Sequence, residues 1–522
     1  MPFKLTYATM FDPPPEMHAH FDRALEDVAA DLGATHAMFV GGTQRRGEIL
    51  EARASPIDQR LVLGQFPLAT RVDAAAAMDA ATRAFDGWRR TTPTDRVALM
   101  RRIAAVIEAR VYHIAAALVL EVGKNRLEAL GEVQETVDFF SLYADDYEAH
   151  GYFDHPLPDD PLAGWVSHNR SVMKPHGPWL VITPFNFPFA LAGGPVAAAL
   201  VTGNAVVLKG SRETPWAGRL LADCLRDAGV PAGVFNYLSG DGPVAGEALL
   251  AHPGLAGVTF TGSYASGMHI WRTLAAGAWP RPCIAEMGGK NACIVTARGD
   301  LDRASAGIVR SAFGMSGQKC SALSRLYVET SVADELMDRL VDATAAVRVG
   351  DPRLREAWMG PVTTQAAYAR YPEVCRRLTE DGSRLVAGGA RLDDGDAAHG
   401  FFIEPALAEA PAAHPLFCKE LFLPILMVAR VGSRDEAMAL CNDSPVGLTA
   451  GVYGDGDDVA WFNDHIEAGV TYANRPQGAT TGAWPGYQPF GGWKGSSSTG
   501  KAIASFHYLA QYLREQSQTV VE

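Results

Sequence analysis

The sequence has little cysteine, no excess of positive charge and no long uninterrupted apolar run, and each shortage excludes a class of protein. Only 7 of the 522 residues are cysteine and no two form a CxxC pair, so neither a disulfide scaffold nor a zinc module is expected. Asp and Glu (59) outnumber Lys and Arg (46), for a formal net charge of −13, which argues against a partner that is nucleic acid or an anionic membrane surface. We therefore expect a protein of a reducing compartment, the cytoplasm.

The longest charge-free stretch, residues 176–208, does not have the composition of a membrane span. It carries Asn186 and Asn204 and is interrupted by prolines at positions 178, 184, 188 and 195. A span needs about 20 predominantly apolar residues that satisfy their own backbone hydrogen bonds. We expect strand, loop, helix and strand in a protein core instead, and residues 1–16 lack the apolar core of a secretory signal.

What the sequence does contain is a regular alternation of strand-like and helical segments. Residues 73–150 have helical periodicity, and residues 151–171 read as an extended hairpin or linker. Fully apolar runs at 179–183, 205–209, 234–238, 257–261 and 281–287 alternate with helices, and a second such series begins after Asn291. This pattern predicts an α/β protein with doubly wound, mostly parallel sheets, divided into two to four domains.

Two local matches are weak. His18 and His20 form an HxH pair in a proline-rich leader, with no further ligand at metal spacing. GDGPVAG (240–246) is one residue too long for a GxGxxG phosphate loop. We expect the leader to be disordered or on the surface, and we expect no metal.

Four uncommon segments each place polar residues at the end of a strand or helix, where α/β folds build ligand sites. They are PFNFPF (184–189), VVLKGS (206–211), IAEMGGKNA (284–292) and FGMSGQKCSA (313–322). Cys320 is the one cysteine in a Gly- and Ser-rich turn, with Lys319 beside it. A nucleophilic cysteine needs a lowered pKa or a nearby base, so these residues alone leave Cys320 as a candidate. The other cysteines lie in predicted helices or strands, apart from Cys418, which stays open.

Together with KELFLPI (419–425) and YQPFGGWKGS (487–496), these segments in this order resemble the NAD(P)-dependent aldehyde dehydrogenase superfamily, from about Phe39 to Val521. The resemblance implies the aldehyde dehydrogenase fold: a Rossmann-like cofactor domain, an α/β catalytic domain and a small β oligomerisation element. The corresponding residues are 1–150 and 172–286 for NAD(P) binding, 287–471 for catalysis, and 151–171 with 472–522 for the oligomerisation hairpin and C-terminal segment. A homodimer or higher homo-oligomer is implied, and the apolar tail FHYLAQYL is expected at an interface.

The resemblance also implies the catalytic residues. Cys320 is in the position of the nucleophile that forms a thiohemiacetal and then a thioester. Asn186 matches the amide that joins the Cys320 backbone N–H in the oxyanion hole, where preorganised donors stabilise developing charge. Glu286 matches the general base, and its alternative is an ordinary ion pair at a strand end.

For the cofactor, Lys209 matches the lysine at the adenine ribose, Glu420 the carboxylate at the nicotinamide ribose, and Phe422 the aromatic beside it. Gly262 and Ser263 open a helix and are expected near the pyrophosphate. Leu423 stands where the family commonly has glycine, which is expected to alter the local turn.

Arg212 stands where many NAD-preferring members carry glutamate. A guanidinium can pair with a 2′-phosphate, so NAD is expected as the main cofactor with NADP accepted. The alternative is that Arg212 points to solvent.

Within the superfamily, SAFGMSGQKCSALSR, RPCIAEMGGKNA and TGAWPGYQPFGG resemble the group of 1-pyrroline-5-carboxylate (glutamate γ-semialdehyde) dehydrogenases. In that group the substrate carboxylate is held at positions corresponding to Ser321, Gly482 and Ala483, and two aromatics, mapped here to Phe185 and Phe490, enclose the aliphatic chain.

Trp484 and Pro485 replace smaller residues of the group directly after the carboxylate-binding positions Gly482 and Ala483. The alternative is therefore that the substrate is a bulkier aldehyde. Two further alternatives are a non-catalytic structural member of the fold and acyl transfer to coenzyme A. An intact Cys320, Glu286 and Asn186 set argues against the first, and Glu286 against the second.

Overall fold

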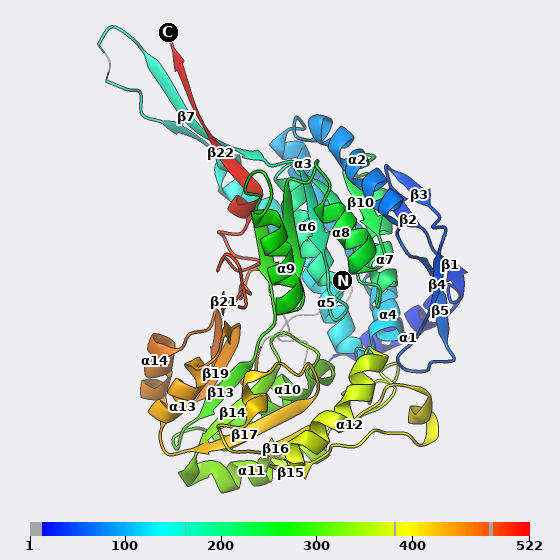
Figure 1. Cartoon of the computed structure of the whole chain (residues 1–522), viewed down its shortest axis with the longest axis vertical. Helices are drawn as coiled ribbons and strands as arrows, with labels where there is room; N and C mark the ends of the chain where they lie inside the picture. Colours follow the sequence, from blue (N-terminus) through cyan, green and yellow to red (C-terminus); the bar gives the residue numbers. More distant parts are fainter. Residues whose placement is uncertain (1–12, 162, 381–382, 480–483) are drawn as a thin grey trace.

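Two seven-stranded sheets, each covered by helices on both faces, make up most of the molecule (Figure 1). The computed structural model describes residues 13–161, 163–380, 383–479 and 484–522. Strands of the first sheet come from residues 38–286 and strands of the second from residues 291–473. The predicted α/β class is confirmed, while the exact boundaries of the three predicted regions stay a prediction.

The first sheet has the strand order β12-β11-β8-β9-β10-β2-β3. Its strands are β2 (Met38–Val40), β3 (Thr43–Arg45), β8 (Pro178–Ile182), β9 (Ala205–Lys209), β10 (Phe235–Leu238), β11 (Gly257–Thr261) and β12 (Cys283–Glu286). The five strands from β8 to β12 are parallel, and β2 and β3 add an antiparallel edge. Along β9, Val206 and Leu208 enter one core while Ala205 and Val207 enter the other. Both faces of the central strands are therefore buried, which is why these strands are mainly apolar.

Helices cover the two faces of this sheet in separate layers. One face carries α2 (Arg71–Trp88), α8 (Glu247–Leu250) and α9 (Tyr264–Ala275). The other carries α6 (Ala190–Val201) and α7 (Pro215–Asp227), which are backed by α3 (Pro93–Ala109), α4 (Val111–Val122) and α5 (Arg126–Ala149). Within the described ranges, no single helix is long and apolar enough to cross a membrane; only α3 and α4 together reach that length and composition, and they are bent by 67° relative to each other.

The second sheet has the order β15-β16-β17-β14-β13-β19-β20, with only β15 antiparallel to its neighbour. Its strands are β13 (Asn291–Val295), β14 (Leu323–Glu329), β15 (Arg384–Ala387), β16 (Ala406–Glu409), β17 (Ile425–Val431), β19 (Thr449–Tyr453) and β20 (Val470–Ala473). Helices α10 (Leu301–Phe313) and α11 (Thr330–Ala345) pack on one face. Helices α12 (Gln365–Glu380), α13 (Arg434–Asn442) and α14 (Gly456–His465) pack on the other.

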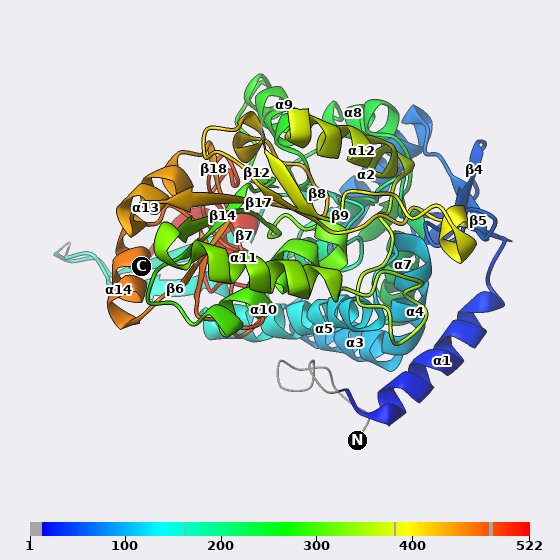
Figure 2. The same cartoon turned by 90° about the horizontal axis from the view of Figure 1, so that it is seen from below.

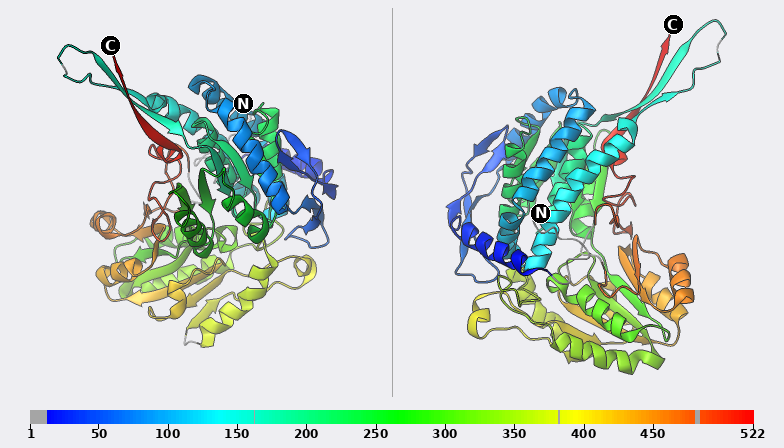
Figure 3. Two further views of the ribbon diagram at one scale, coloured as in Figure 1. Left: turned by 45° about the horizontal axis from the view of Figure 1, so that its top comes forward. Right: turned by 180° about the vertical axis from the view of Figure 1, so that it is seen from behind.

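A three-stranded sheet projects from the body of the protein (Figures 1 and 3). It pairs β6 (Asp154–Leu157) and β22 (Leu513–Val521) with the two sides of β7 (Ser167–Pro175). The segment that leads into β22 differs from the expectation for FHYLAQYL. Tyr508, Leu509 and Tyr512 are fully buried in the first core. Most of the apolar tail therefore packs against its own chain and not at an interface.

The described N-terminal part begins with a helix. Helix α1 (Pro15–Ala29) packs against α4 (Figure 2), with Met17 and Phe21 fully buried. The sequence predicts that the leader around His18 and His20 is disordered or on the surface. It is a helix on the surface of the protein. A small sheet of β1 (Ala34–Thr35), β5 (Val62–Pro67) and β4 (Leu50–Ala54) follows, and β18 (Val446–Gly447) pairs with β21 (Trp493–Lys494) near the C-terminal segment.

Candidate active site

The three candidate catalytic residues come from different chain segments that meet at strand ends. Glu286 is the last residue of β12, Asn186 follows β8, and Cys320 lies between the short 3-10 helix η3 (Gly314–Gly317) and β14. The carboxyl ends of parallel strands form one edge of a sheet, and that edge is where ligand sites of α/β folds are built.

The loop that carries Cys320 is held by two asparagine side chains. Asn186 Nδ2 donates to the carbonyl oxygen of Gln318 at 2.9 Å. Asn291 Nδ2 donates to the carbonyl oxygens of Cys320 (2.6 Å) and Ala322 (2.8 Å). Since an amide nitrogen has two hydrogens, Asn186 keeps one N–H for an oxyanion beside Cys320. Asn186 therefore contacts the loop two residues before Cys320, and its oxyanion-hole role stays a prediction.

The approach to this loop is conformationally strained. Met315 (φ 51°), Ser316 (φ 54°) and Gly317 (φ 67°) all lie in the left-handed region, which costs energy for residues other than glycine. Ser316 Oγ anchors the turn by donating to the carbonyl oxygen of Gly360 at 2.7 Å. At Gly317 a side chain would overlap the Leu423 carbonyl. The nucleophile is therefore delivered by a turn that the surrounding structure holds in place.

Cys320 is half-buried and its thiol is hard to ionise. Burial raises its pKa to about 12, and the carboxylates of Glu420 and Glu286 add to that rise. The thiolate is the reactive form of cysteine. At neutral pH Cys320 thus depends on a neighbouring base to remove its proton.

Glu286 has the environment of such a base. Ser497 Oγ donates to Glu286 Oε1 at 2.8 Å, and Glu286 Oε2 is buried with no hydrogen-bond partner among the described residues. Burial raises the pKa of Glu286 to about 8. A carboxyl with a pKa near the working pH can both accept and return a proton. It is not an ordinary ion pair, which was the alternative interpretation.

The residues expected at the cofactor fit a dinucleotide on two observations. Lys209, at the end of β9, is buried; burial lowers its pKa to about 8, and Asp241 opposes that shift. Glu420 Oε1 accepts a hydrogen bond from Gly289 N at 3.2 Å, and a side chain at Gly288 would overlap that carboxylate. A lysine ammonium at a strand end and a positioned carboxylate can each hydrogen-bond the hydroxyls of a ribose.

Gly262 and Ser263 have partners within the protein. The Gly262 N–H donates to the Glu286 carbonyl oxygen at 3.1 Å, so it is not free for a pyrophosphate. Ser263 is exposed at the N-terminus of α9, where its hydroxyl accepts from Ser266 N at 3.3 Å. The geometry thus does not support the expected pyrophosphate contact of Gly262, because that strand end already uses the donor.

Arg212 neither points freely to solvent nor presents an open guanidinium. It forms ion pairs with Glu51 (2.6 Å) and Asp241 (2.8 Å). Leu423 also differs from its expectation: the left-handed residue is Phe422 (φ 54°), while Leu423 is buried in the second core. The turn therefore bends at the residue before the substitution, and Leu423 serves packing.

A cavity of about 420 Å³ lies beside the nucleophile loop. Its wall includes Phe187 next to Asn186, Lys319 next to Cys320, and Trp484. Arg310, Arg475 and Glu128 are also among its lining residues. A cavity with apolar rings and several cationic side chains suits a short substrate with a negative charge.

The two aromatics predicted for the substrate site are not in the described wall of the cavity, and their role stays a prediction. The ring of Phe185 packs edge-on against Phe422 at 5.8 Å, on the cofactor side, and the described wall of the cavity contains Phe187 instead. Phe490 is buried in the first core and pairs its backbone with Ile503. Ser321 is buried directly after Cys320, and Gly482 and Ala483 lie outside the described residues.

The segment PFNFPF is held by a buried ion pair that sequence reasoning missed. Lys124 Nζ lies 2.5 Å from Glu132 Oε2 and 3.3 Å from the ring centre of Phe187. Glu132 Oε1 accepts from Phe189 N (2.8 Å) and Ala190 N (3.1 Å). Lys124 lies between α4 and α5, and Glu132 lies within α5. The pair is local in the chain, but the backbone groups that Glu132 holds, Phe189 N and Ala190 N, are 57 and 58 residues away, so the sequence carried no signal for this contact.

Comparison with known proteins agrees with this geometry. Residues 45–517 match the aldehyde dehydrogenase family. The 1-pyrroline-5-carboxylate dehydrogenase of Geobacillus thermodenitrificans is 36% identical over 508 residues, 96% of each chain, and that of Anoxybacillus flavithermus is 35% identical over the same share. A crystal structure of 1-pyrroline-5-carboxylate dehydrogenase from Thermus with bound NAD has a TM-score of 0.92 and 32% identity, covering 100% of this chain and 99% of that one.

Proposed function

Because the chain belongs to the aldehyde dehydrogenase family, we propose that it oxidises L-glutamate γ-semialdehyde, the open form of 1-pyrroline-5-carboxylate, to L-glutamate in proline catabolism. It is an NAD(P)-dependent oxidoreductase that acts on aldehydes. The observation that carries the substrate is the similarity to 1-pyrroline-5-carboxylate dehydrogenases over 96% of both chains. The cavity that Lys319 lines supports it, because several arginine side chains are also in its wall and this substrate is short and ends in a carboxylate.

The chemistry follows from the three residues that the fold brings together. Ionised Glu286 takes the proton of the Cys320 thiol, and the sulfur bonds to the aldehyde carbon. The amide of Asn186 and the backbone N–H of Cys320 stabilise the resulting oxyanion. Lys209 and Glu420 would hold NAD, which would supply the hydride acceptor.

Release of the acid repeats the same roles. Loss of the hydride leaves a thioester on Cys320. After Glu286 has released its first proton to solvent, it removes a proton from water, the oxygen of that water bonds to the thioester carbon, and the oxyanion hole acts a second time. The carbon–sulfur bond then breaks and Glu286 returns its proton to the departing Cys320 thiolate, so the products are the carboxylic acid and the free thiol.

The test is a set of initial rates with pyrroline-5-carboxylate and a panel of other aldehydes, for the wild type and two cysteine variants. Cys320→Ser should lose at least about 10³-fold in kcat. Cys418→Ser, which removes an exposed thiol elsewhere, should retain full activity. Turnover of other aldehydes without turnover of pyrroline-5-carboxylate would exclude the proposed substrate, and undiminished activity of Cys320→Ser would exclude the mechanism.

We also propose that copies of the chain associate through the projecting sheet of β6, β7 and β22. Its exposed apolar side chains support this proposal, because such patches usually mark interfaces: Leu157, Trp165, Val166, Val520 and Val521. All seven cysteines are free, and a free catalytic thiol favours a reducing compartment. We therefore propose a cytoplasmic location. Separately, we propose the three predicted regions as the domain division of the chain.

A further inference from the structure

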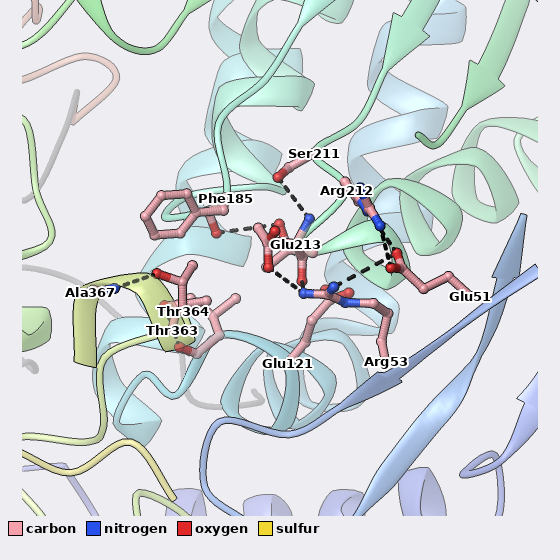
Figure 4. A network of polar contacts seen from close by, with 12 residues as sticks. Glu51, Arg53, Glu121, Phe185, Ser211, Arg212, Glu213, Thr363, Thr364 and Ala367 are labelled. Carbon is pink, nitrogen blue, oxygen red and sulfur yellow. Dashed lines mark hydrogen bonds and ion pairs between the residues drawn. The ribbon is translucent and has the colours of Figure 1, made fainter. Parts of the chain in front are cut away.

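A cluster of charged side chains surrounds Arg212, with Glu51, Arg53 and Glu213 among its members (Figure 4). Arg212 donates through Nε to Glu51 Oε2 at 2.9 Å and through Nη2 to Glu51 Oε1 at 2.6 Å. Its Nη1 donates to Asp241 Oδ1 at 2.8 Å. Glu51 belongs to β4 and Asp241 follows β10. Two segments that are far from Arg212 in the sequence thus hold its guanidinium.

Arg53, the second arginine of this cluster, is also bonded to a carboxylate. Arg53 pairs with the carboxylate of Glu213, donates to the Glu213 carbonyl oxygen at 3.3 Å and lies 3.8 Å from Glu51. The cluster therefore contains three carboxylates against two guanidinium groups. Both guanidinium groups are bonded to carboxylates, and the surplus charge is negative.

The cluster lies where the two dinucleotides differ. Asp241 is close enough to Lys209 to influence its titration, and Arg212 is three residues from Lys209 along the chain. Lys209 is the proposed contact of the adenine ribose, and NADP differs from NAD by a phosphate on the 2′-oxygen of that ribose. An arginine binds such a phosphate through paired N–H groups, and in Arg212 the Nε and Nη2 edge that would do so already holds Glu51.

We propose that Glu51 and Asp241 select NAD over NADP by holding Arg212 in their own ion pairs, so that a 2′-phosphate meets carboxylates instead of a free guanidinium. The inference rests on the proposed role of Lys209 at the ribose. It makes Glu51 a positioning residue, because it acts through Arg212 and not on the nicotinamide. It also means that the presence of Arg212, three residues after Lys209, does not by itself confer NADP binding.

The experiment measures the dissociation constants of NAD and NADP by titration calorimetry on the full-length protein. In the double variant Glu51→Gln/Asp241→Asn, Arg212 is released, so NADP should bind about tenfold tighter or more while NAD changes by less than about threefold. The control Asp86→Asn/Glu148→Gln removes the same two charges at exposed surface pairs and should change neither constant. No gain in NADP affinity in the double variant would overturn the proposal.

A second variant tests whether the gain comes from Arg212 itself. In the double variant background, Arg212→Ala removes the released guanidinium and should abolish the gain in NADP affinity. In the wild-type background, Arg212→Ala leaves Glu51 and Asp241 without their ion-pair partner, so NADP should not bind more tightly. Retention of the tenfold gain in the triple variant would overturn the proposal. Failure of the wild type to bind NAD would contradict the proposed function instead, whereas equal binding of both dinucleotides would contradict the selection alone.

Discussion

At the scale of single residues, the site works because buried polar groups are left incompletely satisfied. Glu286 has one oxygen bonded to Ser497 and the other without a partner among the described residues. Such desolvation is expensive for a carboxylate, and it is also what brings its pKa into the range useful to a general base.

The pH dependence follows from Glu286, whose pKa burial raises to about 8. The base acts only when ionised, so kcat/KM should rise with pH, with unit slope below about 8, and level off above it. A pH profile of kcat/KM with pyrroline-5-carboxylate measures this. Glu286→Gln should have low activity and no such rise; a wild-type profile already flat below about pH 6 would be inconsistent with this base.

The two phenylalanines that flank Asn186 should have separable roles. Phe187 lines the cavity and Phe185 packs on Phe422 at the cofactor side. Phe187→Ala should raise KM for the aldehyde by about tenfold, because an aromatic wall is lost. The matched Phe185→Ala variant should mainly raise KM for NAD. Steady-state kinetics with each substrate varied in turn would measure both, and the reverse assignment would show that the sequence-based choice of Phe185 was right.

At the scale of elements, two buried carboxylates hold the N-termini of helices at the site edge of the first sheet. Glu132 accepts from the backbone at the start of α6, and Glu121 accepts from Trp216 N (2.5 Å) and Ala217 N (2.9 Å) at the start of α7. A carboxylate at a helix N-terminus satisfies unpaired N–H groups and the helix dipole. Glu132 and Glu121 thereby hold the helix ends that follow the loops after β8 and β9.

Removing one of these carboxylates should destabilise the protein and the site together. Glu132→Gln leaves Lys124 buried without its counter-charge, so the free energy of unfolding should fall by about 3–5 kcal/mol. Glu148→Gln on the same helix breaks only a surface pair with Arg101 and should cost at most about 1 kcal/mol. Urea denaturation midpoints of the two variants give the comparison. Equal midpoints would mean that the Lys124–Glu132 pair does not stabilise the loop.

At the scale of the whole molecule, the projecting sheet is the feature that a single copy does not explain. The double variant Trp165→Asp/Val166→Asp places charge on its exposed apolar tip and should convert an oligomer to a smaller species. Val72→Asp changes an exposed valine on α2 and should have no such effect. Light scattering coupled to size-exclusion chromatography measures the masses. A wild type that elutes as a monomer would contradict the proposed association.

Much of the site was predictable because catalytic residues sit in short local contexts. The turn around Cys320, the strand end at Glu286 and the loop with Asn186 each have a recognisable composition, and alternation of apolar strands and helices predicted both sheets. The substrate aromatic was not predictable with the same certainty. Phe185 and Phe187 are chemically identical and two residues apart, and only the path of the loop decides which ring faces the cavity.

The sequence by itself determined the class of fold and predicted a nucleophile, a base and an oxyanion donor, because hydrophobic periodicity and local motifs are properties of neighbouring residues. The tertiary structure alone decided which partner each charge has. Arg212 pairs with Glu51 and Asp241, and Ser497 donates to Glu286. These contacts join segments far apart in the chain, and the energy of a charge depends on its surroundings in space rather than on its neighbours in sequence.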